Sequence, residues 1–234
     1  AFLGGGSRES VDWAPRLDLS ETDSHFEVHL DLPGVSEDDL EIDEWSEDFE
    51  DGLGEFTAAS GTGAVVWHTS SDESASGTYS VNFADPLQST YGHPNGPSEG
   101  QLISSPILVP PFQQGNPYVD FKLLLKTEWG EQSDKSSFNE LFPTDTLRVY
   151  ISEASTNYII QDMQWVSFFT SNTTDGLWIN TRVDLDAYRG EEVKLIFEFD
   201  TYDKQNNNYA GPFIDDVNFG TTCKPKSAVQ CLYS

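Results

Sequence analysis

The sequence has few basic residues and few residues of the reactive types. Its 234 residues include 12 Lys and Arg against 40 Asp and Glu, with four His, two Cys and one Met, and the formal net charge is −28. DNA, RNA or an anionic membrane surface would be repelled by this charge, so we expect no nucleic-acid partner. The same charge suits a protein soluble outside the cell, a binder of divalent cations, or a protein adapted to salt or heat, and composition does not separate these.

Long apolar runs are also missing. No stretch approaches the roughly 18 consecutive apolar residues of a membrane span, so we expect no membrane insertion. The chain opens with Ala1 rather than Met, which is typical of a mature secreted protein and favours an extracellular or cell-surface location. Cys223 and Cys231 are the only cysteines, and we expect a small disulfide loop between them. The alternative is that both are free buried thiols in an intracellular protein. A zinc site is not expected, because no histidine has zinc-ligand spacing to the cysteines.

Motifs for nucleophilic or metal-assisted catalysis are absent. The sequence contains no Gly-x-Ser-x-Gly, no His-Glu-x-x-His, and no Cys with a plausible base. Glycoside hydrolysis uses a pair of carboxylates. With 40 acidic residues in the chain, almost any two could form such a pair, so their presence does not indicate a glycosidase. We therefore expect a protein that is not an enzyme.

Short β-type runs separated by Gly, Pro, Asn and Ser clusters fill most of the chain. No segment has convincing helical periodicity, so the pattern predicts an all-β fold in which two sheets form a sandwich. The predicted strands are Gly63–His68, Thr78–Phe83, Gln101–Val109, Tyr118–Glu128, Thr146–Ser152, Trp165–Thr170, Leu177–Leu185, Val193–Thr201 and Pro212–Phe219.

The first 44 residues differ from the rest, and we interpret them as an extended acidic arm with one or two strands. Phe26, Val28, Leu30 and Leu32 alternate with polar residues and stop at Pro33-Gly34, which predicts a strand with one apolar face. Such a strand could complete the sheet of a neighbouring copy and build a filament, or fold back on its own sandwich. The predicted organisation is an arm (1–44), a sandwich (45–222) and a C-terminal disulfide loop (223–234).

Residues from about 45 to 220 resemble the MAM-like jelly rolls, including the extracellular domains called choice-of-anchor J. The matching elements are Asp48-Phe49-Glu50, Trp67, Leu102 to Ile107, Leu147 to Ser152, Val183 to Gly190 before Val193 to Phe197, and Ile214-Asp215-Asp216-Val217. The resemblance implies a two-sheet jelly roll, often with a structural cation between the first and last strands, and a role in adhesion, glycan contact or accessory binding.

Within that resemblance, Glu50 and Asp216 match the cation pair, with Asp215 and Asp51 as helpers. Oxygen ligands of this kind suit Ca²⁺. A carboxylate beside a buried Phe or Ile also needs a partner, and the chain has too few Lys and Arg to pair them all. The alternative is that these acids are solvated strand ends.

Residues 13–42 resemble the opening of the alpha-crystallin domain of small heat-shock proteins. The match runs from Trp13-Ala14-Pro15-Arg16-Leu17-Asp18 through Glu21-Thr22 to Leu32-Pro33-Gly34-Val35 and Asp38-Asp39-Leu40. The further strands, the Gly-x-Leu element and the Ile-x-Ile/Val tail of that family are absent, so we do not expect a chaperone.

Aromatic residues in or beside loops offer flat apolar faces to sugar rings. The predicted glycan contacts are Tyr91, Trp129, Trp178, Tyr202 and Tyr209. Packing at an interface between subunits or domains uses the same chemistry and is the alternative. The leading interpretation is a structural subunit of an extracellular or cell-surface assembly whose partners are other copies of itself. The alternative is a carbohydrate-binding or adhesin module.

Overall fold

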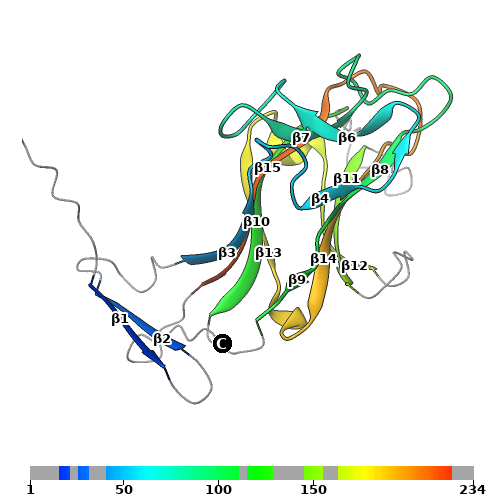
Figure 1. The fold of residues 1–234 in the computed structure, drawn as a ribbon. Helices are drawn as coiled ribbons and strands as arrows, with labels where there is room; N and C mark the ends of the chain where they lie inside the picture. The colour runs from blue at the N-terminus through cyan, green and yellow to red at the C-terminus, as the bar shows by residue number, and fades with distance from the viewer. Residues whose placement is uncertain are drawn as a thin grey trace, which may run out of the picture.

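A computed structural model shows a two-sheet β-sandwich preceded by a β-hairpin (Figure 1). It describes residues 16–21, 26–31, 41–110, 115–128, 145–154 and 163–222. Every pair of described strands is antiparallel. The predicted all-β sandwich is confirmed.

The first sheet has seven strands and carries β15, the longest of the described strands, near its middle. Its members are β3 (Glu41–Glu47), β5 (Gly61–Thr62), β6 (Val65–Ser70), β7 (Ser80–Ala84), β10 (Asn116–Lys126), β13 (Ile179–Asp184) and β15 (Gly211–Thr222). The strand order is β13-β10-β15-β7-β6-β5. One edge of β15 pairs with β10, and the other edge pairs first with β7 and then with β3.

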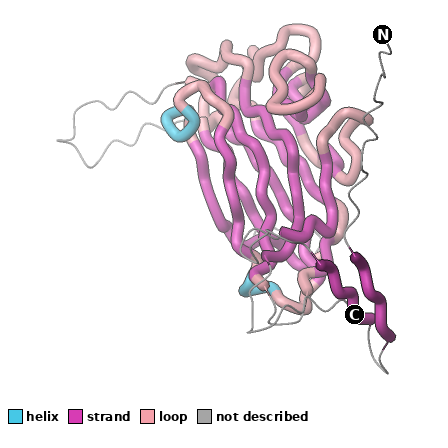
Figure 2. The backbone as a smooth tube through the Cα atoms, turned by 90° about the vertical axis from the view of Figure 1, so that its left-hand side faces the viewer, coloured by secondary structure: helices cyan, strands magenta, loops and turns pink. Residues whose placement is uncertain are grey.

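The second sheet has six strands and faces the first across the core (Figure 1). Figure 2, turned by 90°, shows the long strands of the sandwich running side by side. Its members are β4 (Phe56–Ala58), β8 (Glu99–Ser104), β9 (Ile107–Leu108), β11 (Thr146–Glu153), β12 (Met163–Phe169) and β14 (Glu192–Asp200). The order is β12-β11-β14-β8-β4, and β9 also pairs with β14. Helical structure in the described residues is limited to α1 (Ser171–Thr174) and one 3₁₀ turn, η3 (Asp186–Tyr188), and no described helix is long and apolar enough to cross a membrane.

The core lies between the two sheets and is rich in aromatic side chains. Phe121 of β10 meets Phe197 of β14 edge to face, with ring centroids 5.0 Å apart, so this pair ties the sheets together. On β10, Val119, Phe121 and Leu123 are buried in this core. The residues between them therefore lie on the outer face of the sheet, which is where the candidate site is found.

Each of the nine predicted runs overlaps a strand. The run Gln101–Val109 is divided into β8 and β9, and β4 and β5 were not predicted because they are only three and two residues long. The sandwich begins at Glu41 rather than residue 45, since β3 pairs with β15 from Glu41 onward.

The N-terminal hairpin joins β1 (Arg16–Glu21) to β2 (Phe26–Asp31), with Leu19 opposite Val28 and Leu17 opposite Leu30. The predicted strand at Phe26 is therefore confirmed up to Asp31, whereas Leu32 lies outside the described residues. Among the described residues, the hairpin forms its own two-stranded sheet and pairs with no strand of the sandwich. Cys223, Cys231 and Trp129 also lie outside the described part, so the disulfide stays a prediction.

Candidate functional site

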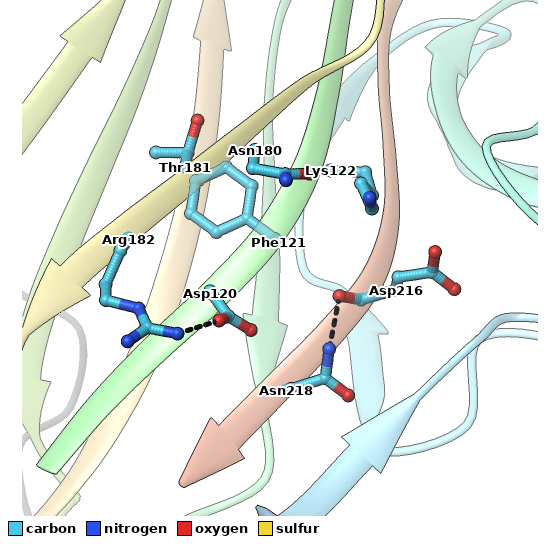
Figure 3. A pocket seen from close by; sticks show the side chains of 8 residues that line it. All are labelled: Asp120, Phe121, Lys122, Asn180, Thr181, Arg182, Asp216 and Asn218. Atoms are coloured by element: carbon cyan, nitrogen blue, oxygen red, sulfur yellow. Dashed lines mark hydrogen bonds and ion pairs between the residues drawn. The ribbon is translucent and has the colours of Figure 1, made fainter. Parts of the chain in front are cut away.

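A hollow of about 320 Å³ lies on the outer face of the first sheet, where β13, β10 and β15 run side by side (Figure 3). Most of the residues around it are polar or charged. The lining consists of Asp120, Phe121, Lys122, Asn180, Thr181, Arg182, Asp216 and Asn218.

The strand register arranges the lining as cross-strand rows. Asp120 of β10 lies opposite Arg182 of β13 on one side and opposite Asn218 of β15 on the other. Asn218 in turn lies opposite Ser46 of β3. Neighbouring strands are about 4.8 Å apart. One row of polar side chains therefore crosses four strands, and Lys122 lies beside it.

A β-bulge places Asp216 in the hollow. Asp120 pairs with Asn218 but Lys122 pairs with Asp215, so β15 has two residues where β10 has one. The extra residue changes the alternation of β15, which lets Ile214 and Val217 both enter the core although they are three residues apart. Asp216 then takes a left-handed conformation with φ of 47°, which non-glycine residues rarely adopt.

Asp216 is held in that conformation from two sides. Its carboxylate accepts a hydrogen bond of 2.7 Å from the Ser76 hydroxyl, and its main-chain carbonyl accepts one of 3.0 Å from the Asn218 amide (Figure 3). Non-glycine residues in this region of backbone conformation gather at functional sites, where the surrounding structure fixes them. The bulge thus fixes Asp216 at the edge of the hollow.

Arg182 is also fixed in place. It donates a hydrogen bond of 2.5 Å to Asp120, and its guanidinium carbon lies 3.6 Å from the centroid of the Tyr118 ring. Tyr118 is 2% exposed, so its ring forms the floor beneath the guanidinium. By contrast, no hydrogen bond or ion pair joins Lys122 or Asn180 to another described side chain. These two side chains project into the hollow with their polar groups available to a ligand (Figure 3).

Three of the residues predicted to bind calcium, Glu50, Asp215 and Asp216, meet at the loop between β6 and β7. Glu50 accepts hydrogen bonds of 2.7 Å from the main-chain amides of both Thr78 and Tyr79. Asp215 is fully buried and accepts from the amides of Ala75 and Ser76, at 2.7 and 3.2 Å. Burial raises the pKa of the Asp215 carboxyl, and these amide hydrogen bonds oppose the rise.

Carboxylates at this position therefore already anchor the loop between β6 and β7. Asp51 is exposed on the turn after Glu50. Across the described part of the chain, no group of three or more His, Cys, Asp or Glu side chains is placed to hold a metal ion. The described carboxylates alone do not make a calcium site here, and calcium at Glu50 and Asp216 stays a prediction.

The predicted glycan contacts do not line the hollow. Tyr91 is fully buried against Phe199 in the core, so the expectation that it offers a ring face to a sugar is wrong for this structure. Tyr202 and Tyr209 are 41% and 40% exposed, as a loop contact requires, and Trp178 is partly exposed. Tyr202 lies over Arg148, with 4.9 Å from the guanidinium carbon to the ring centroid, beside the second sheet.

Apart from Asp216, the residues that line the hollow were not predicted from the sequence. A signal was present in the run Tyr118–Glu128, where Asp120 and Lys122 alternate with Val119, Phe121 and Leu123. Alternation of that kind marks a strand with one face outside the core. The sequence did not show that β13 and β15 would flank this strand, because pairing between distant strands is set by the whole fold.

Comparison with known proteins gives similarity in structure only. No family model matches the chain, and no curated protein matches it in sequence. A structure described as a carbohydrate-binding module of the beta-sandwich superfamily with promiscuous specificity is 16% identical and covers 74% of this chain, with a TM-score of 0.48. The chain spans 60% of the length of that structure.

Two further solved structures show the same level of likeness. The K1 cleaved adhesin domain of Lys-gingipain from Porphyromonas gingivalis W83 is 18% identical, with 75% of this chain and 96% of that chain covered and a TM-score of 0.48. The CBM22-1 xylan-binding domain from Paenibacillus barcinonensis Xyn10C is 12% identical, with 79% and 97% covered and a TM-score of 0.42. These are likenesses of a β-sandwich fold.

Proposed function

We propose that the chain is a non-catalytic carbohydrate-binding or adhesin module, and that the hollow over β10, β13 and β15 holds its glycan. The observation that carries this proposal is the set of hydrogen-bonding groups across adjacent strands. A sugar hydroxyl both donates and accepts. Lys122 and Arg182 supply donors, Asp120 and Asp216 supply acceptors, and the Asn side chains supply both.

The charge of the hollow favours a neutral glycan. Its lining contains two basic and two acidic side chains, so these charges cancel. The rest of the chain is strongly acidic, with a formal net charge of −28 for the whole, and would repel an anionic polysaccharide as it approached. The ligand class we infer is a neutral oligosaccharide or polysaccharide on an extracellular or cell-surface target.

Binding without catalysis fits the state of the two acids in the hollow. Asp120 accepts from Arg182, and Asp216 accepts from Ser76. Each carboxylate is thus engaged by its own protein partner. A glycosidase needs one carboxyl group as an acid and another as a base or nucleophile, on either side of the bond to be broken.

Affinity electrophoresis of the full chain in gels containing neutral polysaccharides tests this function directly. We expect retardation in at least one neutral polysaccharide, and loss of that retardation in Lys122→Ala. Lys194→Ala is the matched control, because it removes a lysine from β14 in the opposite sheet. Equal retardation of wild type and Lys122→Ala would show that the hollow is not the site.

The salt dependence of binding distinguishes a neutral ligand from a charged one. Attraction between exposed charges is screened at about 0.15 M salt and above, whereas short hydrogen bonds within a site are affected much less. We expect the retardation to persist at high salt. Loss of binding on raising the salt would indicate an anionic ligand and contradict the proposed neutral glycan.

Self-assembly is the second candidate function, and the hairpin is the observation that favours it. β1 and β2 pair only with each other among the described strands, which leaves one edge of each open to a further strand. Electron microscopy of the full chain and of a version lacking residues 1–40, which keeps β3 intact, tests it. Filaments in the full chain alone would support assembly through the hairpin, and single particles in both samples would contradict it.

A further inference from the structure

A second polar cluster lies away from the hollow, around the buried carboxylate of Asp145. This residue directly precedes β11 and is 1% exposed. The Tyr91 hydroxyl donates a hydrogen bond to Asp145 Oδ2, and the main-chain amide of Glu128 donates to the Tyr91 oxygen at 3.1 Å. Asp145 Oδ1 has no hydrogen-bond partner. Burying a carboxylate oxygen without a partner costs folding free energy, so we expect a further group to bind at this oxygen.

A second buried oxygen without a partner belongs to Asn207, which is 3% exposed. Its amide nitrogen donates to the Thr201 hydroxyl at 3.1 Å and to the main-chain carbonyl of Asp203 at 2.8 Å. Those two acceptors fix the orientation of the amide, because a flipped amide would place its carbonyl against the Asp203 carbonyl. Asn207 Oδ1 is therefore held facing away from both, with no donor to satisfy it.

The two oxygens belong to segments that lie against each other. The Tyr91 amide donates to the Tyr209 carbonyl at 3.2 Å, and the Tyr91 and Tyr209 rings stack with centroids 6.5 Å apart. The negative charge of Asp203, in the 201–209 segment, lies close enough to Asp145 to raise the pKa of the Asp145 carboxyl, as does the charge of Glu128. Burial is the main cause of that rise, and both charged neighbours are negative.

The buried atoms without a hydrogen-bond partner are all of one element. In the described part of the chain, the buried side-chain atoms without a hydrogen-bond partner are all oxygens, and three of the four belong to Thr127, Asp145 and Asn207. Thr127 directly precedes Glu128, so all three belong to the segments just described. Hard cations take such ligands: Ca²⁺ binds six to eight oxygens from carboxylates, amide side chains, main-chain carbonyls and water.

We propose that a Ca²⁺ ion binds between Asp145 and the 201–209 segment, with Asp145 Oδ1 and Asn207 Oδ1 among its ligands. No three described acidic side chains surround one point, so amide, main-chain and water oxygens complete the coordination. The ion neutralises negative charge that Glu128 and Asp203 bring to the site. It uses none of the residues that line the hollow, and it is separate from the calcium predicted at Glu50 and Asp216.

Isothermal titration of the full chain with CaCl₂, after treatment with a chelator, tests this site. We expect wild type to bind Ca²⁺, and Asp145→Asn to bind it at least about tenfold more weakly or to lose one equivalent. Asn207→Ala is a second variant in case Asp145→Asn does not fold, and we expect it to weaken binding in the same direction. Asp216→Asn is the control, and the Ca²⁺ bound at Asp145 should survive in it.

Each other result overturns the proposal. If wild type binds no Ca²⁺ at millimolar concentration, a buried water satisfies these oxygens and the cation is absent. If wild type binds Ca²⁺ but Asp145→Asn and Asn207→Ala bind it equally well, the ion sits elsewhere. Loss of binding in Asp216→Asn alone would assign the calcium to the β15 bulge.

Discussion

Arg182 lies across the Tyr118 ring, with its guanidinium carbon 3.6 Å from the ring centroid, while the same group donates a 2.5 Å hydrogen bond to Asp120. This arrangement gives the hollow one donor group of fixed orientation. A lysine keeps the charge but cannot stack its planar group on the ring or present a fork of donors. Arg182→Lys therefore tests orientation separately from charge.

We expect Arg182→Lys to weaken glycan binding by about 1.4 kcal/mol, on the order of tenfold in Kd. Titration calorimetry with the glycan identified by affinity electrophoresis measures it. Arg189→Lys is a suitable control, because Arg189 is paired with Asp186 beyond the end of β13 and does not line the hollow. Equal affinity of Arg182→Lys and wild type would mean that the stacked guanidinium does not contact the ligand.

The Asp216 bulge gives a prediction about stability. Asp and Asn tolerate the left-handed conformation better than other residues with side chains, so Asp216→Asn should be nearly neutral. Asp216→Ala loses both that tolerance and the hydrogen bond from Ser76, and we expect it to lower the free energy of unfolding by about 1–2 kcal/mol. Urea denaturation of both variants checks this, and an Asp216→Ala midpoint equal to that of wild type would count against strain at the bulge.

The bulge also shows why the fold was predictable and the site was not. Alternation within runs such as Val193–Thr201 depends on local burial, and it located the strands correctly. The phase change between Ile214 and Val217 was visible, since two core residues three apart cannot share one face of a regular strand. The sequence alone does not show that this phase change is a β-bulge, because the partner strand β10 that reveals it lies about 90 residues away.

The exposure of the loop aromatics could not be predicted from the sequence either. Tyr91 lies in a polar, glycine-containing loop, which favours exposure, yet its ring is buried beside Phe199 and its hydroxyl meets Asp145. Asp145 lies 54 residues further along the chain, so no local pattern could pair them. Long-range contacts of this kind decide whether a loop aromatic contacts a ligand or the core.

Glu50 anchors the loop between β6 and β7 through two amide hydrogen bonds from Thr78 and Tyr79. We expect Glu50→Ala to lower the free energy of unfolding by about 1–2 kcal/mol, a modest loss because both amides belong to exposed residues and can bond to water. Asp51→Ala is the control, since Asp51 is exposed. Urea denaturation of the two variants checks it, and equal midpoints would contradict the anchoring role.

Calcium at Glu50 and Asp216 can be tested in the same proteins. If an ion binds there, a chelator should lower the melting temperature of Asp145→Asn, in which the proposed second site is disabled, because a ligand of the folded state stabilises it by mass action. The same chelator should then have no effect on Asp145→Asn combined with Glu50→Ala. An unchanged melting curve of Asp145→Asn in chelator would show that no calcium binds at this loop.

Burial beside Glu128 and Asp203 raises the pKa of Asp145 from 3.8 to about 8. A carboxyl whose pKa is higher in the folded chain than in the unfolded chain favours folding while it is protonated. Its contribution is fully present below a pH of about 4 and is lost as the pH rises through about 8. We expect the urea midpoint of chelator-treated wild type to fall between about pH 5 and pH 8, with Asp145→Asn, which carries no titrating group there, falling less. Parallel profiles for the two proteins would show that Asp145 keeps an ordinary pKa in the folded chain.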